Sequence, residues 1–315
     1  MAKILVTGGS GFVGSNLIGR LLRDGHEITS VDDYSNGLKE NNMAGVKYLE
    51  CDLSKSESLR AITSVDFDAI YHLAAQSSNA ISMKYPARDL LINQLATLNL
   101  IDFCSVNKIS RVIFTSSMSV YGNQSIFPTS SEEAPKPETF YAIHKAASER
   151  YFQISREIDW TIFRLYTTYG AGQNLSNLEQ GLVKIFLGYI LRNEPIKIHG
   201  SMNRIRDIIH VSDVVEALAK SLFETQTHRQ IYNLGSGKTL SIHKLIVDIL
   251  RECGKPENYP VIIEEGDTGD PRKTHADIDL TMMALDWSPK VTPSEGIALT
   301  VSKYKDEIGT NKNFR

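Results

Sequence analysis

Hydrophobic residues along the chain form short strand-like runs that alternate with helical patterns. The first run, KILVTGG at residues 3–9, is followed by apolar residues at helical spacing from Val13 to Leu22. Strand-like runs recur at EITSVDD, VKYLE, AIYHLA, RVIFTSS and TIFRLY, and helical patterns over residues 89–104 and 139–155 lie between them. Such alternation predicts an α/β fold with a doubly wound parallel sheet of the Rossmann type.

The pattern loosens after residue 165, where glycine and proline residues separate shorter elements. We therefore expect a first domain over residues 1–165 and a smaller C-terminal α/β lobe over residues 166–315. The run IYNLG at 231–235 is strand-like and can still return to the edge of the main sheet. Ligands of such sheets gather at the carboxyl ends of the strands, so the site is expected there.

A glycine-rich turn with the spacing G-x-x-G-x-x-G follows the first strand. Strand, glycine turn and helix start together form the setting in which backbone N–H groups bind a pyrophosphate, although the spacing departs by one residue from G-x-G-x-x-G. Asp32 and Asp33 end the second strand, where a carboxylate hydrogen-bonds a ribose 2′-hydroxyl; this favours NAD over NADP. The expected cofactor site comprises Gly8, Gly11, Phe12, Val13, Gly14, Asp32, Asp33, Asp52, Leu53, Leu73, Ala74, Ala75 and Asn93.

Tyr141 and Lys145, in the run YAIHK, are four residues apart in the helix predicted over 139–155, so they share one face. Ser117 ends an earlier strand-like run. A free tyrosine has a pKa of about 10, so a phenol that serves as a base near neutral pH needs adjacent positive charge, which Lys145 can supply. We expect these three residues to be catalytic, because they can move a proton while a nicotinamide moves a hydride. Tyr141 and Lys145 are also expected to contact the cofactor.

Composition narrows the classes of protein to which the chain can belong. It has 315 residues, 42% hydrophobic and 23% charged, with a net charge of −3, which argues against a nucleic-acid surface. The three cysteines and eight histidines match no metal-ligand spacing, and sparse cysteines suit a reducing compartment. There is no room for a signal peptide before the first strand and no apolar run of the roughly 18 residues of a membrane span. We therefore expect a cytoplasmic protein that binds no metal.

Several segments carry a resemblance to a known family: TGGSGFVGSNL, YHLAAQSS, SSMSVYG, YAIHKAASE, RIRDIIHVSDVVEAL, IYNLGSGKTLSI, HADIDL and LDWSPKV. They resemble the extended short-chain dehydrogenase/reductases that act on nucleotide sugars, over nearly the whole chain. The chain is most similar to the NAD-dependent epimerases of the UDP-galactose 4-epimerase type. The resemblance implies a Rossmann domain that binds NAD, a C-terminal lobe that binds a nucleoside diphosphate sugar, and catalysis by Ser117, Tyr141 and Lys145. It also implies a homodimer paired through the helices at 89–104 and 139–155.

The implied reaction is epimerisation at C4 of a UDP-hexose or UDP-N-acetylhexosamine, by transient oxidation to a 4-keto sugar and return of the hydride to the other face. Met118 and Ser119 follow Ser117, where the family's dehydratases carry an Asp-Glu pair and its decarboxylases a Glu. Neither residue can act as a carboxylate acid or base, which argues against those two reactions. An NAD(P)-dependent 4-keto reductase remains open, and so does a non-catalytic NAD-binding sensor, although the intact Ser, Tyr and Lys favour an enzyme.

The resemblance also implies a substrate site, from which this chain departs at three positions. Arg206 matches a position that grips the diphosphate, because a planar guanidinium suits bidentate phosphate contact. Relatives commonly carry an arginine where this chain has Asp267, so Arg272 is the expected substitute. Thr167 and Thr274 stand for a substrate-binding asparagine and a bulky tyrosine, and a small residue at 274 leaves room for an N-acetyl group. The expected substrate site comprises Ser117, Thr167, Arg206 and Arg272.

Overall fold

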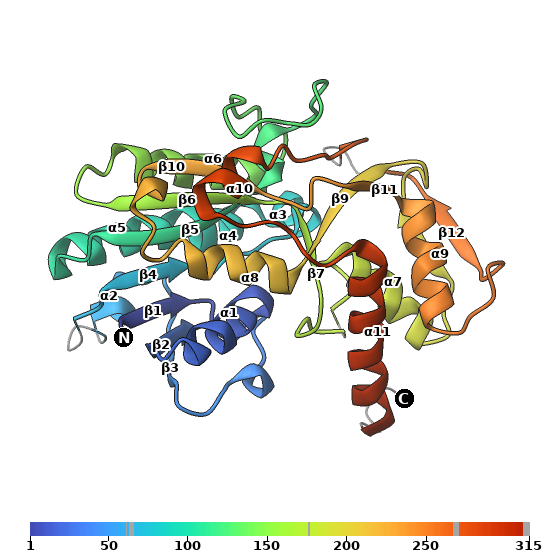
Figure 1. The fold of residues 1–315 in the computed structure, drawn as a ribbon, viewed down its shortest axis with the longest axis horizontal. Helices are drawn as coiled ribbons and strands as arrows, with labels where there is room; N and C mark the ends of the chain where they lie inside the picture. Colours follow the sequence, from blue (N-terminus) through green and yellow to red (C-terminus); the bar gives the residue numbers. More distant parts are fainter. Residues whose placement is uncertain (61, 63–65, 176, 267–270, 311–315) are drawn as a thin grey trace.

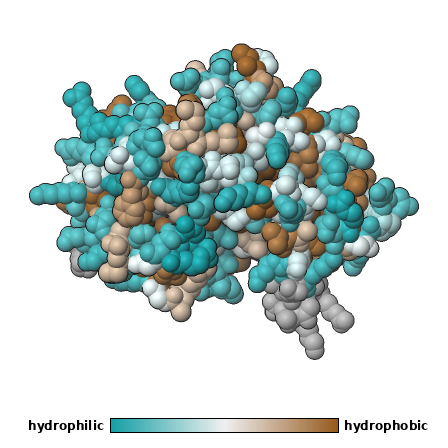
Figure 2. All heavy atoms as spheres, in the orientation of Figure 1, coloured by the Kyte–Doolittle hydropathy of each residue, from teal (hydrophilic) through white to brown (hydrophobic). Residues whose placement is uncertain are grey.

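The computed structural model describes the chain except residues 61, 63–65, 176, 267–270 and 311–315. A larger lobe built on a seven-stranded sheet stands beside a smaller lobe formed by much of the C-terminal half (Figure 1). The face seen in Figure 2 is mostly hydrophilic, with hydrophobic residues scattered among polar ones. Over the described residues, no helix is long and apolar enough to cross a membrane.

The main sheet is parallel throughout, with the strand order β10-β6-β5-β4-β1-β2-β3. Alternate residues of a strand face opposite sides, so Ile4 and Val6 enter one core and Leu5 enters the other. The prediction of a doubly wound parallel sheet is confirmed. Its strands are β1 (Lys3–Thr7), β2 (Glu27–Asp32), β3 (Lys47–Glu50), β4 (Ala69–His72), β5 (Arg111–Ser117), β6 (Asp159–Leu165) and β10 (Gln230–Leu234).

Helices cover both faces of the main sheet because its central strands are apolar on both sides. On one face lie α1 (Phe12–Arg23) and α8 (Val211–Lys220), which pack against each other. On the other face lie α5 (Ala96–Asn107) and α6 (Phe140–Ile154). Shorter helices of this lobe are η1 (Lys39–Asn41), α2 (Ser56–Arg60), α3 (Asn79–Lys84), α4 (Pro86–Leu90), η2 (Leu91–Leu95), η3 (Met118–Tyr121), η4 (Thr225–Thr227) and α10 (Asp279–Leu285).

The smaller lobe has its own hydrophobic core and two small sheets. In the three-stranded sheet, β9 lies between β7, to which it is parallel, and the antiparallel β11. The parallel pair β8 and β12 forms the second sheet. The elements of this lobe are β7 (Thr167–Tyr169), α7 (Leu182–Leu191), β8 (Ile196–His199), β9 (Ile205–His210), β11 (Thr239–Ser241), α9 (Ile242–Glu252), β12 (Val261–Glu264) and α11 (Pro293–Thr310).

The chain crosses between the lobes several times after residue 165. Strand β10 pairs with β6, so the run near 231–235 does lie at the edge of the main sheet. Helix α8 also returns to the main sheet, where it packs against α1. The smaller lobe is therefore assembled from several segments, between which the chain returns to the larger lobe, and helix α11 is the last of them.

Candidate active site

The turn between β1 and α1 can be built only from glycine at two positions. Gly8 has a φ of +71°, and a Cβ there would lie 2.8 Å from the backbone of Ala74. A Cβ at Gly14 would lie 2.1 Å from the carbonyl oxygen of Gly8. Helix α1 begins with Gly11 as its N-cap, with no side-chain cap and no acidic residue in its first turn. Its first N–H groups and its positive end are therefore available to an anion.

The carboxylate of Asp32 is held in place by backbone groups at the end of β2. It accepts hydrogen bonds from the N–H groups of Ser10 (3.0 Å) and Tyr34 (2.9 Å). Burial raises the pKa of Asp32, and these backbone hydrogen bonds oppose the rise. Gly37 lies so close that a Cβ there would be 2.7 Å from Asp32 Oδ1. Asp33 instead accepts from Ser35 N–H and Oγ, so it shapes the exposed turn that follows.

Tyr141 and Lys145 are brought together with Ser117 at the carboxyl end of β5. Helix α6 begins after Thr139, whose side chain accepts from Ala142 N–H, and this cap places Tyr141 in its first turn. Tyr141 and Lys145 are only 6% and 2% exposed. Ser117 lies close enough to Tyr141 to oppose the rise in the pKa of its phenol. All three residues line one cavity. For Tyr141 and Lys145, the four-residue spacing on the helix had indicated a shared position.

Burial dominates the electrostatics of the two helix residues. It raises the pKa of Tyr141 to about 12, with a further rise from Asp89 and an opposing effect of Ser117. It lowers the pKa of Lys145 to about 7, opposed by Glu149 and Asp89. The Lys145 ammonium lies 4.1 Å from the centre of the Phe114 ring. Ser117 therefore favours the phenolate of Tyr141. Lys145 was expected to have that effect, but desolvation weakens its own positive charge.

A buried carboxylate supports this arrangement from behind. Asp89 of α4 is 1% exposed and contacts His144 Nδ1 at 2.5 Å. It also accepts from Gln76 Nε2 (2.6 Å) and Asn93 Nδ2 (3.1 Å). His144 lies within the Tyr-Lys motif but finds its partner on another helix, which the spacing along its own helix could not reveal. In the described part of the chain, no group of three or more His, Cys, Asp or Glu side chains is placed to hold a metal ion.

The site is a cavity of about 760 Å³ between the two lobes. Apart from Asn93, the residues predicted to bind the cofactor all line it, and so do Ser117, Thr167 and Arg206. Asn93 lies behind the cavity wall, where its Nδ2 donates to the Gln76 carbonyl and to Asp89, and its Oδ1 has no partner among the described residues. The contact of Asn93 with the cofactor stays a prediction.

The predicted substrate residues are placed less uniformly. Arg206 is 4% exposed, and burial lowers its pKa to about 10. Arg272 is exposed and is not among the residues that line the cavity. Its carbonyl accepts from Ile205 N–H, which holds its backbone beside β9, and its contact with a substrate stays a prediction. Thr274 is buried, and its Oγ1 accepts from the N–H of Asp207. Asp267 lies outside the described residues.

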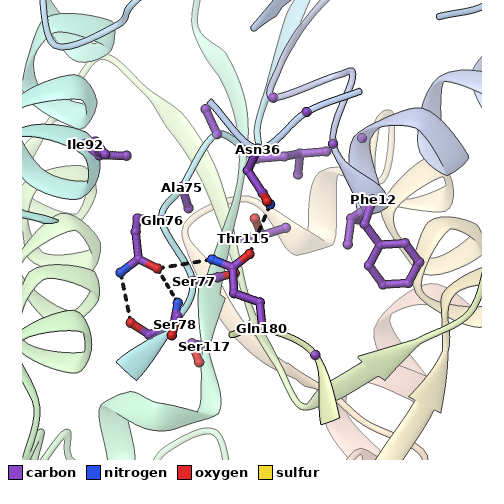
Figure 3. A pocket seen from close by; sticks show the side chains of 18 of the residues that line it. Phe12, Asn36, Ala75, Gln76, Ser77, Ser78, Ile92, Thr115, Ser117 and Gln180 are labelled. Atoms are coloured by element: carbon purple, nitrogen blue, oxygen red, sulfur yellow. Dashed lines mark hydrogen bonds between the residues drawn. The ribbon is translucent and has the colours of Figure 1, made fainter. Parts of the chain in front are cut away.

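A set of amide side chains that the sequence argument did not single out crosses the cavity mouth. Gln180 Nε2 donates to Gln76 Oε1 (3.2 Å), and Asn36 Nδ2 donates to Gln180 Oε1 (3.0 Å), as Figure 3 shows. Asn177 Nδ2 donates to Asn36 Oδ1 (3.0 Å). These residues come from three loops far apart in sequence, so no spacing pattern could have revealed them. Lys184 of α7 also lines the cavity and was likewise missed.

Fold and site together define a dinucleotide-dependent enzyme of the class that uses a Ser-Tyr-Lys set. Residues 4–235 match the NAD dependent epimerase/dehydratase family. The chain belongs to this family, and NAD is therefore its cofactor. The glycine turn, which added Cβ atoms would fill, and the fixed Asp32 carboxylate fit the pyrophosphate and ribose of NAD.

Known relatives are similar over nearly the full length. A UDP-glucose 4-epimerase of Mycolicibacterium smegmatis is 31% identical, with 97% of this chain and 99% of the relative covered. A dTDP-4-dehydro-6-deoxyglucose reductase of Escherichia coli is 32% identical, with 93% and 95% covered. The crystal structure of a UDP-glucose 4-epimerase of Thermotoga maritima with UDP-glucose has a TM-score of 0.92 at 31% identity, with 97% of this chain and 99% of that chain covered.

Proposed function

We propose that this protein is an NAD-dependent epimerase of a nucleoside diphosphate sugar, acting at C4 of a UDP-hexose or UDP-N-acetylhexosamine. The observation that carries the proposal is that Ser117, Tyr141 and Lys145 line the same cavity as the glycine turn. The similarity to the UDP-glucose 4-epimerases of Mycolicibacterium smegmatis and Thermotoga maritima supports it.

In the proposed reaction, Tyr141 takes the proton from a sugar hydroxyl and returns it at the end of the cycle. Ser117 contacts the same oxygen and keeps the phenol oriented. Taking that proton requires the phenolate, which burial disfavours by raising the pKa of Tyr141 to about 12. Ser117 opposes the rise, and a protonated Lys145 would oppose it further. NAD, when bound, supplies the site that accepts a hydride and gives it back.

The residues beside Ser117 limit the reaction to proton and hydride transfer at one carbon. Ser117 Oγ donates to Ser119 Oγ at 3.0 Å, so the position next to the sugar carries a second hydroxyl rather than a carboxylate. Met118 is equally unable to exchange a proton. Elimination of water or loss of CO₂ would need an acid or base that neither side chain supplies.

The direct test is to incubate the purified protein with UDP-, dTDP-, GDP- and CDP-sugars and to follow interconversion of isomers by NMR. We expect a 4-epimer to form, without added cofactor and without net oxidation. The failure of every sugar to interconvert, with the protein folded and NAD bound, would reject the proposal and leave a reductase or a sensor.

A 4-keto reductase is the second candidate, favoured by the similarity to the Escherichia coli reductase. It would use the same Ser117, Tyr141 and Lys145 but would consume one reduced cofactor per turnover. The position of Asp32 weighs against NADPH, because its carboxylate would repel a 2′-phosphate. Stoichiometric loss of NADPH or NADH absorbance with a 4-keto sugar, and no epimerisation, would select the reductase.

We also propose a homodimer, paired through the helices that carry exposed apolar residues on the outside of the larger lobe. Leu90, Leu91 and Leu98 are 42–45% exposed along α4, η2 and α5, and Phe140 and Ile143 of α6 are 39% and 44% exposed. Apolar residues gathered on adjacent helices indicate a helix-to-helix interface. Light scattering at micromolar concentration should give twice the chain mass, and the double variant Leu91→Lys, Ile143→Lys should give a monomer.

The free thiols of Cys51, Cys104 and Cys253 are compatible with a reducing compartment, and on this basis we propose a cytoplasmic location. Cell fractionation with an antibody against the chain should find it in the cytosolic fraction. Recovery of the protein from an oxidising compartment would contradict the proposal.

A further inference from the structure

Lys184 is a charged residue in an apolar helix. Helix α7 has the sequence LVKIFLGYIL, in which Lys184 is the sole charged residue. Its buried neighbours on the helix include Val183, Phe186, Leu187 and Ile190, which belong to the core of the smaller lobe. Lys184 is itself only 3% exposed, yet it lines the cavity between the lobes. A lysine is rarely buried to this degree unless it is paired.

No counter-charge accompanies this lysine within the part of the chain that the structure describes: no hydrogen bond, ion pair or ring contact involves its ammonium group. Burial lowers the pKa of Lys184 to about 8. Desolvation of an ammonium group without a partner is costly, and an anion in the cavity would offset that cost. The position of the side chain on the cavity wall therefore points to a ligand rather than to a structural pair.

Lys184 shares its wall of the cavity with Arg206, a second buried cation. Helix α7 packs against β7, and β7 pairs with β9, which carries Arg206. Thr167 at the start of β7 lines the cavity as well. Arg272, by contrast, is exposed and away from the cavity. The two buried cations of the smaller lobe that line the cavity are thus Lys184 and Arg206.

We propose that Lys184 binds the diphosphate of the nucleotide sugar together with Arg206. This inference rests on the proposed function, because it assumes a nucleoside diphosphate as ligand. A diphosphate carries more than one negative charge, so two cations match it better than one. Lys184 supplies the compact point charge and Arg206 the planar fork. The apolar surroundings of Lys184 strengthen the contact because water does not screen it.

The test measures binding of UDP and of uridine to the NAD-bound protein by calorimetry, for wild type, Lys184→Met, Lys184→Arg and the control Lys197→Met. Lys197 is a half-exposed lysine on β8 in the same lobe. Lys184→Met should weaken UDP binding by roughly 10- to 100-fold, the range for a hydrogen bond to a charged group, and leave uridine within about two-fold. Lys184→Arg keeps the charge and should retain most of the affinity. Lys197→Met should bind both ligands as wild type does.

Three results would overturn the inference. The first is an unchanged affinity of Lys184→Met for UDP. If this variant bound only a UDP-sugar with a carboxylate more weakly, Lys184 would contact the sugar and not the diphosphate. The second is an equal loss for UDP and uridine, which would mean a distorted cavity. The third is a wild-type protein that binds UDP no better than uridine. Calorimetry needs no turnover, so a protein that binds UDP through Lys184 but interconverts no sugar would refute the proposed reaction alone.

Discussion

The two walls of the cavity are built in different ways. The wall of the larger lobe is shaped by backbone around the glycine turn: Gly8 and Gly14 leave no space for a side chain, and Asp32 is held by two N–H groups. The wall of the smaller lobe is made by side chains, with Lys184 and Arg206 as buried cations. Backbone geometry at the first wall fits the common shape of a dinucleotide. At the second wall, substitution of a side chain can change which ligand binds. The comparison explains why cofactor class is easier to infer than the substrate.

The largest expected effect belongs to Tyr141, the proposed catalytic base, which lies on the larger-lobe side of the cavity. Tyr141→Phe removes one hydroxyl and keeps the ring, the helix and the buried volume. Turnover should fall by at least roughly 10²- to 10⁴-fold, as is typical for loss of general acid–base catalysis, with bound NAD and thermal stability little changed. Tyr151→Phe, on the same helix, is the matched control and should turn over normally. Near-normal turnover of Tyr141→Phe would remove the basis for the mechanism.

The backbone wall should tolerate substitution least. Gly8→Ala combines a left-handed φ of +71° with a Cβ 2.8 Å from the backbone of Ala74. Gly25→Ala has a similar φ of +78° but open space around its Cβ, so it carries the conformational cost alone, about 1–2 kcal/mol. We would compare the melting temperatures of the Gly8→Ala and Gly25→Ala proteins and the amount of NAD that each retains after purification. Gly8→Ala should lose more stability and most of its NAD, and equal behaviour of the two variants would contradict a close-packed turn.

Burying the Lys184 ammonium group in the wall of the smaller lobe should make the stability of the protein depend on pH. The pKa of Lys184 is about 8 in the folded protein and 10.5 as its ordinary value, so the unfolded chain binds more protons between these two pH values. The free energy of unfolding of wild type, measured relative to that of Lys184→Met, should therefore rise between pH 8 and about 10.5. In this range the folded protein loses the buried charge of Lys184, and the penalty for burying that charge disappears. At pH 7, without nucleotide sugar, Lys184→Met should melt a few degrees above wild type. A variant that melts below wild type at pH 7 would show that Lys184 has a stabilising partner.

The smallest effect is expected where the two walls meet. Gln180→Ala removes the hydrogen bonds that join Gln76 and Asn36 across the cavity mouth. Two neutral hydrogen bonds at a partly exposed position contribute little each, so NAD should dissociate only several-fold faster, with kcat nearly unchanged. Stopped-flow fluorescence of NAD release measures the rate, and Gln153→Ala on the surface of α6 serves as control. An unchanged rate of NAD release would mean that the hydrogen bonds of Gln180 with Gln76 and Asn36 do not retain the cofactor.

The sequence by itself determined the parallel sheet, the glycine turn, Asp32 and the pairing of Tyr141 with Lys145. These features are local: strand runs, a turn of fixed length and a four-residue helix spacing are decided by neighbours in the chain. Each could therefore be read without knowing what packs against it. The placement of Ser117 in the same cavity as Tyr141 could be expected almost as directly, since strand ends and helix starts meet at one edge of such a sheet.

Only the tertiary structure decided which charges are buried and what they face. Lys184 has the spacing of an ordinary helix residue, and its role depends on α7 lying against β7 at the cavity wall. Arg206 matched a family motif and Arg272 was the expected substitute for a missing arginine, but Arg272 is exposed whereas Arg206 is buried. His144 and Asp89 are 55 residues apart and meet only after α4 and α6 pack. Desolvation depends on the groups that distant segments bring together, so the charges of the site follow from packing and not from spacing.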